Sequence, residues 1–427
     1  MQRKASSTWL ALTAAACLCA GTSFAQTSPV DLPYRSDSVL EPDGWESIDS
    51  PDTIENLLDY QFEPHRGMFR TPLDGLVSAI LREQQKLFDE TGLRIGFRYM
   101  PQFQQASGGP GQRSAAAADI DLMFDWTLLG KGTKDTGRFF FSIEERHRIG
   151  PIPPSQLRNV IGSLAGTTAT FNDRGFTVRD AFWDQRLLEN RLRFLIGRAA
   201  PDDYVGTARY QSSVMGFFNG NLSGNITTPW PGHGPMAMVS ARPSDLFYAT
   251  VGTANAYSTT TQVQISSLDQ GRLFTFGEIG TAPMINGLGR AQIALTSWYM
   301  PSREDPDRVQ DYGLSITYQQ DIGEDWYFMA RYGWADEGLT NIKSAWQAAV
   351  VYSGLFGSPD NATGLGIGYA EPTNDSLRNE TSIDCFQRFQ LTEHTQFSIG
   401  GQLFIDPSNA PDKDVIFVFS LRLRIDL

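Results

Sequence analysis

Residues 414–427 read DVIFVFSLRLRIDL, with an apolar side chain at every second position from Val415 to Leu427. Successive side chains of a β-strand point to opposite faces, so one face of this segment is apolar throughout. The opposite face becomes charged toward its end, at Arg422, Arg424 and Asp426. Such a pair of faces is typical of a strand with lipid on one side and a wet lumen on the other. We therefore expect a transmembrane β-barrel strand here.

The same alternation recurs along the chain. It is clearest over residues 93–100, 119–128, 139–146, 312–320 and 326–334, and weaker versions fill much of the rest. About sixteen such segments can be counted, within the range of bacterial outer-membrane barrels. The sequence thus predicts an all-β fold, a closed antiparallel transmembrane β-barrel of about 16 strands with a short N-terminal helical segment.

The lengths of the connections support this topology. Two long connections, Gly150–Thr177 and Ala199–Pro235, fall on the same side of the expected barrel, whereas short turns such as 189–190 and 393–394 fall on the other. Outer-membrane barrels have long outer loops and short periplasmic turns. The pattern therefore also predicts the orientation of the barrel.

The start of the chain indicates export. Arg3 and Lys4 precede an apolar stretch, residues 9–20, and Ser23-Phe24-Ala25 follows, so residues 1–25 are predicted to be a signal peptide. The remaining sequence has no apolar run long enough for a membrane-spanning helix. Together with the alternation, this favours the bacterial outer membrane. The net charge of −13 argues against nucleic acid as a partner.

Residues 26–91 are expected to form a periplasmic extension, followed by the barrel over 92–427. Within the extension, residues 73–90 have apolar side chains at helical spacing, which predicts an amphipathic helix. Two placements are open: packed on protein at the periplasmic mouth, or inserted into the lumen as a plug. The apolar face favours the first, because it prefers protein to a wet lumen. A short helix is also possible over Thr53–Asp59.

Several ordered stretches resemble the OprB-type carbohydrate-selective porin family. They are FSIEERH (141–147), FWDQ (182–185) with LIGR (195–198), DYG (311–313) with ARYG (330–333), GLFG (354–357) with GLG (364–366), and the segment Asp384–Arg388 with Gln402, Asp406-Pro407 and LRL (421–423). The sequence departs from the family at Asp384, where Glu is common, at Gln387, where an aromatic is common, and at Leu427, where Phe is usual.

The resemblance implies an outer-membrane channel that passes sugars down their gradient, with no cofactor and no energy coupling. Arg and carboxylate groups at a constriction can replace water at sugar hydroxyls. Arg94 and Arg98 are expected near Arg422 and Arg424 as one cationic wall, because the first and last strands of a closed barrel are neighbours. The candidate pore-lining residues are Arg94, Arg98, Glu144, Arg146, Arg331, Asp384, Arg388, Gln402, Arg422, Arg424 and Trp230.

Trp230 lies in the longest connection, beside prolines and glycines. Either this connection folds inward and Trp230 is a sugar-stacking platform, or it stays outside with Trp230 packed on its own prolines. By contrast, Trp126, Trp326, Trp334 and Trp346 are expected at the lipid interface.

Other functions were weighed against the sugar channel. The four histidines show no metal spacing, and no G-x-S-x-G motif is present, so an enzyme is not expected. A general or acid-selective diffusion porin is the nearest alternative. The expected partners are mono- or oligosaccharides, outer-membrane lipids and the barrel-assembly machinery, and the chain is expected to be a monomer or a homotrimer.

Overall fold

The computed structural model describes residues 44–63, 65–262, 265–303 and 309–427. The expected signal peptide lies outside these residues. Within the described ranges no helix is both long enough and apolar enough to cross a membrane.

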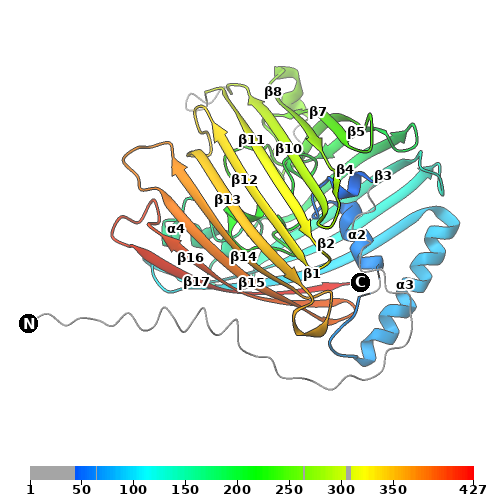
Figure 1. Cartoon of the computed structure of the whole chain (residues 1–427), viewed down its shortest axis with the longest axis horizontal. Helices are drawn as coiled ribbons and strands as arrows, with labels where there is room; N and C mark the ends of the chain where they lie inside the picture. Colours follow the sequence, from blue (N-terminus) through cyan, green and yellow to red (C-terminus); the bar gives the residue numbers. More distant parts are fainter. Residues whose placement is uncertain (1–43, 64, 263–264, 304–308) are drawn as a thin grey trace, which may run out of the picture. The chain divides into compact units, whose positions relative to one another are not determined.

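The described residues form one antiparallel sheet (Figure 1). Seventeen strands are numbered in this part of the chain, and β9 (Met284–Ile285) is a two-residue ladder within a turn. The remaining sixteen make the wall. They are β1 (Leu93–Ala106), β2 (Ser114–Leu129), β3 (Gly137–Arg148), β4 (Gly175–Leu187), β5 (Leu192–Ala199), β6 (Gly234–Ala241), β7 (Phe247–Asn255), β8 (Leu273–Thr281), β10 (Gly289–Met300), β11 (Asp311–Ile322), β12 (Trp326–Ala335), β13 (Ile342–Ser353), β14 (Ala362–Pro372), β15 (Glu380–Thr392), β16 (Thr395–Ile405) and β17 (Val415–Asp426).

The sheet closes on itself at the seam between β1 and β17. β1 pairs with β2 on one side and with β17 on the other, with Arg98 opposite Asp426 and Gln102 opposite Arg422. Beyond the end of β17, Leu427 exchanges two backbone hydrogen bonds of 2.9 Å with Phe97. The predicted fold, a closed antiparallel barrel of 16 strands, is confirmed.

The two faces of the wall differ as the alternation predicted. In β17 the side chains of Val415 and Phe417 are exposed on the outer face, whereas Val418 and Arg422 are buried on the inner face. Trp126 and Trp326 are exposed near one end of their strands, and Trp346 near the other end. An apolar outer band with aromatic residues toward both ends is the surface that a bilayer requires.

The connections separate by length onto the two ends of the barrel. The end that carries 149–174 and 200–233 is called here the long-loop end, and the end that carries 188–191, 323–325 and 393–394 the short-turn end. Both long connections contain short helices: α4 (Pro154–Ile161) in the first, η3 (Pro201–Asp203) and α5 (Gly220–Ser223) in the second. Single turns η4 (Ser266–Gln270) and η5 (Leu355–Gly357) occur in other connections.

Residues 44–62, called here the N-terminal hairpin, occupy the lumen. The hairpin contains η2 (Trp45–Ser47) and α2 (Ile54–Phe62). Trp45 packs with Tyr248 of β7, Asp49 bonds Arg193 of β5, and Tyr60 bonds Gln390 of β15. A segment that contacts strands on so many sides of a closed barrel can only lie inside it. Its apex is at Asp52, whose carboxylate accepts a hydrogen bond from Ser212.

Helix α3 (Pro72–Thr91) lies beside the barrel at the short-turn end (Figure 1). Asp74 accepts hydrogen bonds from Thr71, which caps the first turn, and Gly92 ends the helix with a φ of 75°. Leu76 and Ile80 are exposed. Of the two placements weighed for the helix expected over 73–90, insertion into the lumen is therefore wrong. The N-terminal hairpin occupies the lumen instead.

Candidate functional site

Residues 200–233, called here the inner loop, fold into the barrel and cross it. The backbone N–H of Gly206 donates to Glu278 of β8 at 2.6 Å. Farther along, the N–H groups of Phe218 and Asn219 both donate to Asp384 of β15 at 2.7 Å. The inner loop thus narrows the lumen from one wall to the other, and the outside placement weighed for it is wrong.

Three predicted pore arginines bind the backbone of this loop. Arg331 of β12 donates to the carbonyl oxygen of Gly206 and to Gln211. Arg388 of β15 donates to the carbonyl of Met215 at 3.0 Å. The guanidinium of Arg422 donates to two further carbonyls of the loop, at 2.5 and 2.9 Å. Carbonyl oxygens in a narrow lumen need donors, and guanidinium groups supply several in a fixed geometry.

Gln402 of β16 helps to hold both long connections. Its side-chain amide donates to the carbonyl of Thr167, in the first long connection, at 3.0 Å. Its carbonyl oxygen accepts from Asn219 of the inner loop at 3.4 Å. Together with Asp384, it places the inner loop against β15 and β16.

Carboxylates separate the arginines near the seam. Arg98 bonds Asp121 at 2.5 Å, and Arg94 bonds Asp59 of the N-terminal hairpin at 2.5 Å and Asp125 at 2.6 Å. Arg424 bonds Asp426 at 2.8 Å. β1 and β17 are neighbours as expected, but the arginines do not form one cationic wall. Arg94, Arg98 and Arg424 each have a carboxylate partner, and Arg422 alone donates to backbone carbonyls.

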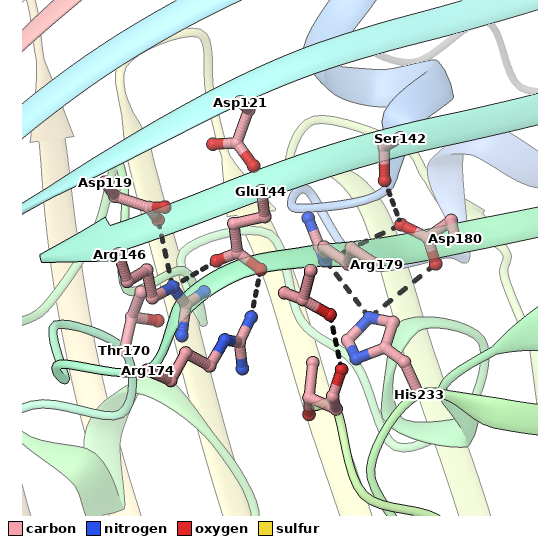
Figure 2. A network of polar contacts seen from close by, with 12 residues as sticks. Asp119, Asp121, Ser142, Glu144, Arg146, Thr170, Arg174, Arg179, Asp180 and His233 are labelled. Atoms are coloured by element: carbon pink, nitrogen blue, oxygen red, sulfur yellow. Dashed lines mark hydrogen bonds and ion pairs between the residues drawn. The ribbon is translucent and has the colours of Figure 1, made fainter. Parts of the chain in front are cut away.

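A second polar array runs along β2, β3 and β4 and includes both long connections. Figure 2 shows it, and we call it the charge ladder. Glu144 lies between Arg146 and Arg174 and forms an ion pair with each. Arg146 also lies 3.4 Å from Asp119. The members of the charge ladder are Asp119, Asp121, Glu144, Arg146, Arg174, Arg179, Asp180 and His233.

His233 belongs to the inner loop and closes the far end of the charge ladder. Arg179 donates through Nε to Nε2 of His233 at 3.0 Å, and Asp180 lies 3.6 Å from the same nitrogen. Burial lowers the pKa of His233 to about 3. The ring is therefore neutral at physiological pH, with Nε2 as an acceptor. Burial also lowers the pKa of Arg174 to about 10, which leaves its guanidinium charged.

A β-bulge brings both Arg179 and Asp180 to the inner face. The register between β3 and β4 shifts between Ser142 and Ile143, so that Ser142 faces Asp180 and Ile143 faces Val178. The extra residue, Arg179, interrupts the alternation, and two consecutive side chains are buried. Ser142 donates to Asp180 at 2.8 Å and holds it in place.

The carboxylates of the charge ladder keep free acceptor capacity. Both oxygens of Asp119, and Oδ1 of Asp121, have no hydrogen-bond partner among the described residues. Both side chains are buried. A buried carboxylate is stable only if hydrogen bonds satisfy its oxygens, so these atoms favour contact with water or with hydroxyl groups.

Comparison with known proteins identifies the family. Residues 112–427 match the model of the carbohydrate-selective porin family, OprB. The chain belongs to the OprB family. The barrel of Pseudomonas putida OprB in its high-pH structure superposes with a TM-score of 0.70 at 13% sequence identity, covering 86% of this chain and all of that one. Its low-pH structure matches with a TM-score of 0.53 at 14% identity and the same coverage.

Two curated relatives of this OprB-family chain are also porins. Porin AaxA of Chlamydia abortus is 22% identical over 399 residues, which cover 88% of each chain. Porin AaxA of Chlamydia trachomatis is 23% identical over 271 residues, which cover 61% of this chain and 58% of that one. The family match identifies the chain as a carbohydrate-selective porin of the bacterial outer membrane, and the closed barrel agrees with it.

Trp230 is in the inner loop but packs on the wall. Its ring meets that of Phe274 edge-on, with 5.8 Å between centroids, and Phe274 stacks on Trp298 at 6.3 Å. The ring is half-buried in this OprB-family lumen rather than packed on its own prolines. Its role as a sugar-stacking platform stays a prediction.

The pore-lining residues predicted from the sequence do not include Asp119, Arg174, Arg179, Asp180 or His233. Arg174 and His233 lie in connections, where no alternation reports which way a side chain points. Arg179 and Asp180 lie at the bulge, where alternation fails. In this member of the OprB family, the sequence signal that could have pointed to Arg174 and His233 was their position in two long connections at the same end of the barrel.

Two groups in the charge ladder have the donor atoms of a cation site. One is Asp119 with Asp121 and Glu144. The other is Asp180 and His233 together with Asp203 of η3, which lies outside the ladder. Arg146, Arg174 and Arg179 form ion pairs with these carboxylates. Because guanidinium groups already supply positive charge beside these carboxylates, they disfavour the binding of a further cation.

Proposed function

We propose that small sugars cross this OprB-family channel passively, down their gradient, along the charge ladder. The observation that carries the proposal is the free hydrogen-bonding capacity of Asp119 and Asp121 beside the guanidinium of Arg146. A sugar hydroxyl both donates and accepts, so it can donate to these carboxylates and accept from a guanidinium in place of water. Each such contact replaces a hydrogen bond to water, so the net binding energy of the sugar stays small enough for the sugar to be released.

The balance of charge along the ladder supports a neutral substrate. Asp119, Asp121, Glu144 and Asp180 alternate with arginines from the same strands and connections. An acid-selective porin would be expected to carry an excess of positive charge at its constriction. A general diffusion porin, by contrast, would pass sugars and other neutral solutes of the same size at equal rates.

The orientation follows from the two ends of the barrel. We infer that the long-loop end faces outward and the short-turn end, with the N-terminal hairpin and α3, faces the periplasm. Because the charge ladder comes from a single chain, the proposal holds for a monomer and for a homotrimer.

A hydrolase is not supported by the arrangement of His233. In a Ser-His-Asp triad the histidine lies between the nucleophile and the carboxylate. Here Ser142 donates directly to Asp180, and Arg179 donates to Nε2 of His233, the atom that would take a proton. His147 bonds Glu145 at 2.6 Å, and no serine or cysteine hydrogen-bonds it within the described residues. We infer that the protein is a channel without catalytic activity.

Liposome swelling tests the proposal. Proteoliposomes should swell faster in glucose or maltose than in uncharged non-sugar solutes of similar size, and faster than in gluconate. Arg174→Ala removes one donor that faces the ladder while Glu144 keeps Arg146, so it should slow sugar entry about threefold to tenfold. Arg174→Lys should keep part of the rate.

Arg148→Ala is the matched control for this substitution. Arg148 lies near the same connection but is about half exposed and pairs with Asp173 outside the ladder. It should leave sugar entry unchanged. Equal swelling rates for sugars and for other neutral solutes of the same size would identify a general porin and reject the proposal.

A further inference from the structure

A polar cavity of about 750 Å³ lies at the long-loop end, outside the charge ladder. Its lining comes from four connections: α4 with the residues that follow it, and the connections β12–β13, β14–β15 and β16–β17. The polar residues that matter here are Asn159, Thr340, Asn341, Thr373, Asn374 and Asn409. The volume is in the range of about 300 to 1,000 Å³ usual for small-molecule sites.

The lining is polar and mostly neutral. Amides and hydroxyls dominate, and the one charged lining residue, Arg158, uses its Nη2 to bond the carbonyl of Leu164 at 2.8 Å. Neutral groups that donate and accept suit sugar hydroxyls. A cation or an anion would call for charged groups, and an apolar ligand for an apolar lining.

Several of these polar groups are unused. The hydroxyl oxygen of Thr340 is buried and has no hydrogen-bond partner in the described part of the chain. The side-chain amides of Asn159 and Asn409 are exposed to solvent and make no hydrogen bond with the described residues, so they are accessible to a ligand. A buried hydroxyl without a partner costs free energy, so it favours a ligand that supplies one.

One buried carboxylate holds the wall of the cavity in shape. Glu380, at the start of β15, accepts hydrogen bonds from the hydroxyl of Ser163 at 2.8 Å and from the backbone N–H groups of Leu164 at 2.7 Å and Ala165 at 2.9 Å. The N–H of Ser408 donates to the same carboxylate at 3.3 Å. Two of the four connections are thereby tied together, so the cavity is formed before a ligand arrives.

The same connection that lines the cavity also reaches the charge ladder. Residues 162–164 line the cavity, and Arg174 from the same connection pairs with Glu144. The cavity and the charge ladder are thus both built in part by the first long connection.

We propose that this cavity is a vestibule that binds a mono- or disaccharide before it enters the constriction. The inference rests on the proposed sugar transport and adds a saturable binding step at the long-loop end. At low sugar concentration such a step raises the local concentration of sugar at the mouth of the channel. At high sugar concentration the site is saturated, and the constriction limits the flux.

The test uses the triple variant Asn159→Ala, Thr340→Val and Asn409→Ala. These changes remove unused polar groups and break no hydrogen bond between described residues. The control is Gln156→Ala with Asn379→Ala, because both residues are exposed at the same end and neither lines the cavity. Initial uptake of radiolabelled glucose and maltose into proteoliposomes is measured against concentration, with single-channel conductance in potassium chloride measured in parallel.

The parent should show saturable uptake. In the triple variant the half-saturating sugar concentration should rise about tenfold, equivalent to about 1.4 kcal/mol, with the conductance unchanged. The control should match the parent. A triple variant that saturates at the parent's concentration, or a parent whose sugar uptake is not saturable, overturns the vestibule but leaves sugar transport standing. A parent that passes no sugar overturns the proposed function itself.

Discussion

Arg422 illustrates what a charged side chain does in this lumen. Its guanidinium donates to the carbonyls of Ser213 and Gly216 and lies over the ring of Phe218, 4.5 Å from the centroid. All three contacts belong to the inner loop. At the scale of the residue, Arg331, Arg388 and Arg422 therefore hold the inner loop in place, whereas Asp119 and Asp121 of the charge ladder keep oxygens without a hydrogen-bond partner among the described residues.

At the same scale, His233 predicts a pH dependence of stability. Its pKa is about 3 in the folded protein, because burial disfavours the charged ring, and about 6.5 in an unfolded chain. Below pH 6.5 the unfolded state binds a proton that the folded state does not, so stability is lost as the pH falls from 6.5 toward 3. For this one group the loss is at most about 1.4 kcal/mol per pH unit.

The measurement is guanidinium unfolding in detergent micelles at pH 7.5 and pH 5. His233→Gln keeps an acceptor for Arg179 and removes the titration, so it should lose about 2 kcal/mol less than the parent between these pH values. His147→Gln, at a more exposed histidine, should behave like the parent. The prediction fails if His233→Gln and the parent lose the same stability.

At the scale of the element, the N-terminal hairpin is held by ion pairs to the wall. Glu55 of α2 bonds Arg138 of β3 and Arg186 of β4, and Asp49 bonds Arg193 of β5 at 2.5 Å. Tyr60 lies under the guanidinium of Arg424, 4.7 Å from its carbon. The hairpin is therefore held to the wall both before and after its apex at Asp52.

Glu55→Gln should loosen this hairpin. The amide keeps one acceptor oxygen, so one arginine retains a weaker hydrogen bond and the other faces the NH2 group, at a cost of about 1–3 kcal/mol to the docking of α2. The expected result is a larger and noisier single-channel conductance in planar bilayers, because the lumen is less obstructed. Glu83→Gln, on the exposed surface of α3, is the control. Conductance and noise identical to the parent would show that the hairpin does not limit the current.

The elements also show what could be predicted from the sequence. The strands were predictable because period-2 alternation is a local property and membrane strands are exposed to lipid on one face. The inner loop and the hairpin were not, because their partners are remote in sequence: Gly206 meets Arg331, and Glu55 meets Arg186. The alternation therefore predicts which arginines lie on the inner face of the wall. It does not predict that they bind the inner loop, nor where the charge ladder lies.

At the scale of the whole molecule, the seam between β1 and β17 holds the barrel closed. It was predictable, since a closed barrel must join its first and last strands. The charges along it were not predictable, because Asp121 and Asp59 reach Arg98 and Arg94 from other elements. The last contact of the seam is made by the backbone of Leu427 with Phe97.

Deleting Leu427 should weaken closure. Both backbone hydrogen bonds to Phe97 are lost, which should cost about 1–3 kcal/mol. Leu427→Phe keeps both bonds and an apolar side chain, so it should fold like the parent. The fraction of folded barrel is read from unheated gel electrophoresis and from the guanidinium midpoint. Equal folded fractions for the deletion and the parent would contradict a role for this residue in the seam.

The position of Tyr60 has a consequence for how the chain is assembled. This residue precedes every strand, yet its ring lies under Arg424 and its hydroxyl accepts a hydrogen bond from Gln396, on the last two strands to be synthesised. The contacts that hold the hairpin are therefore complete only when the final strand is in place. Full docking of the N-terminal hairpin is therefore coupled to closure of the barrel and cannot precede it.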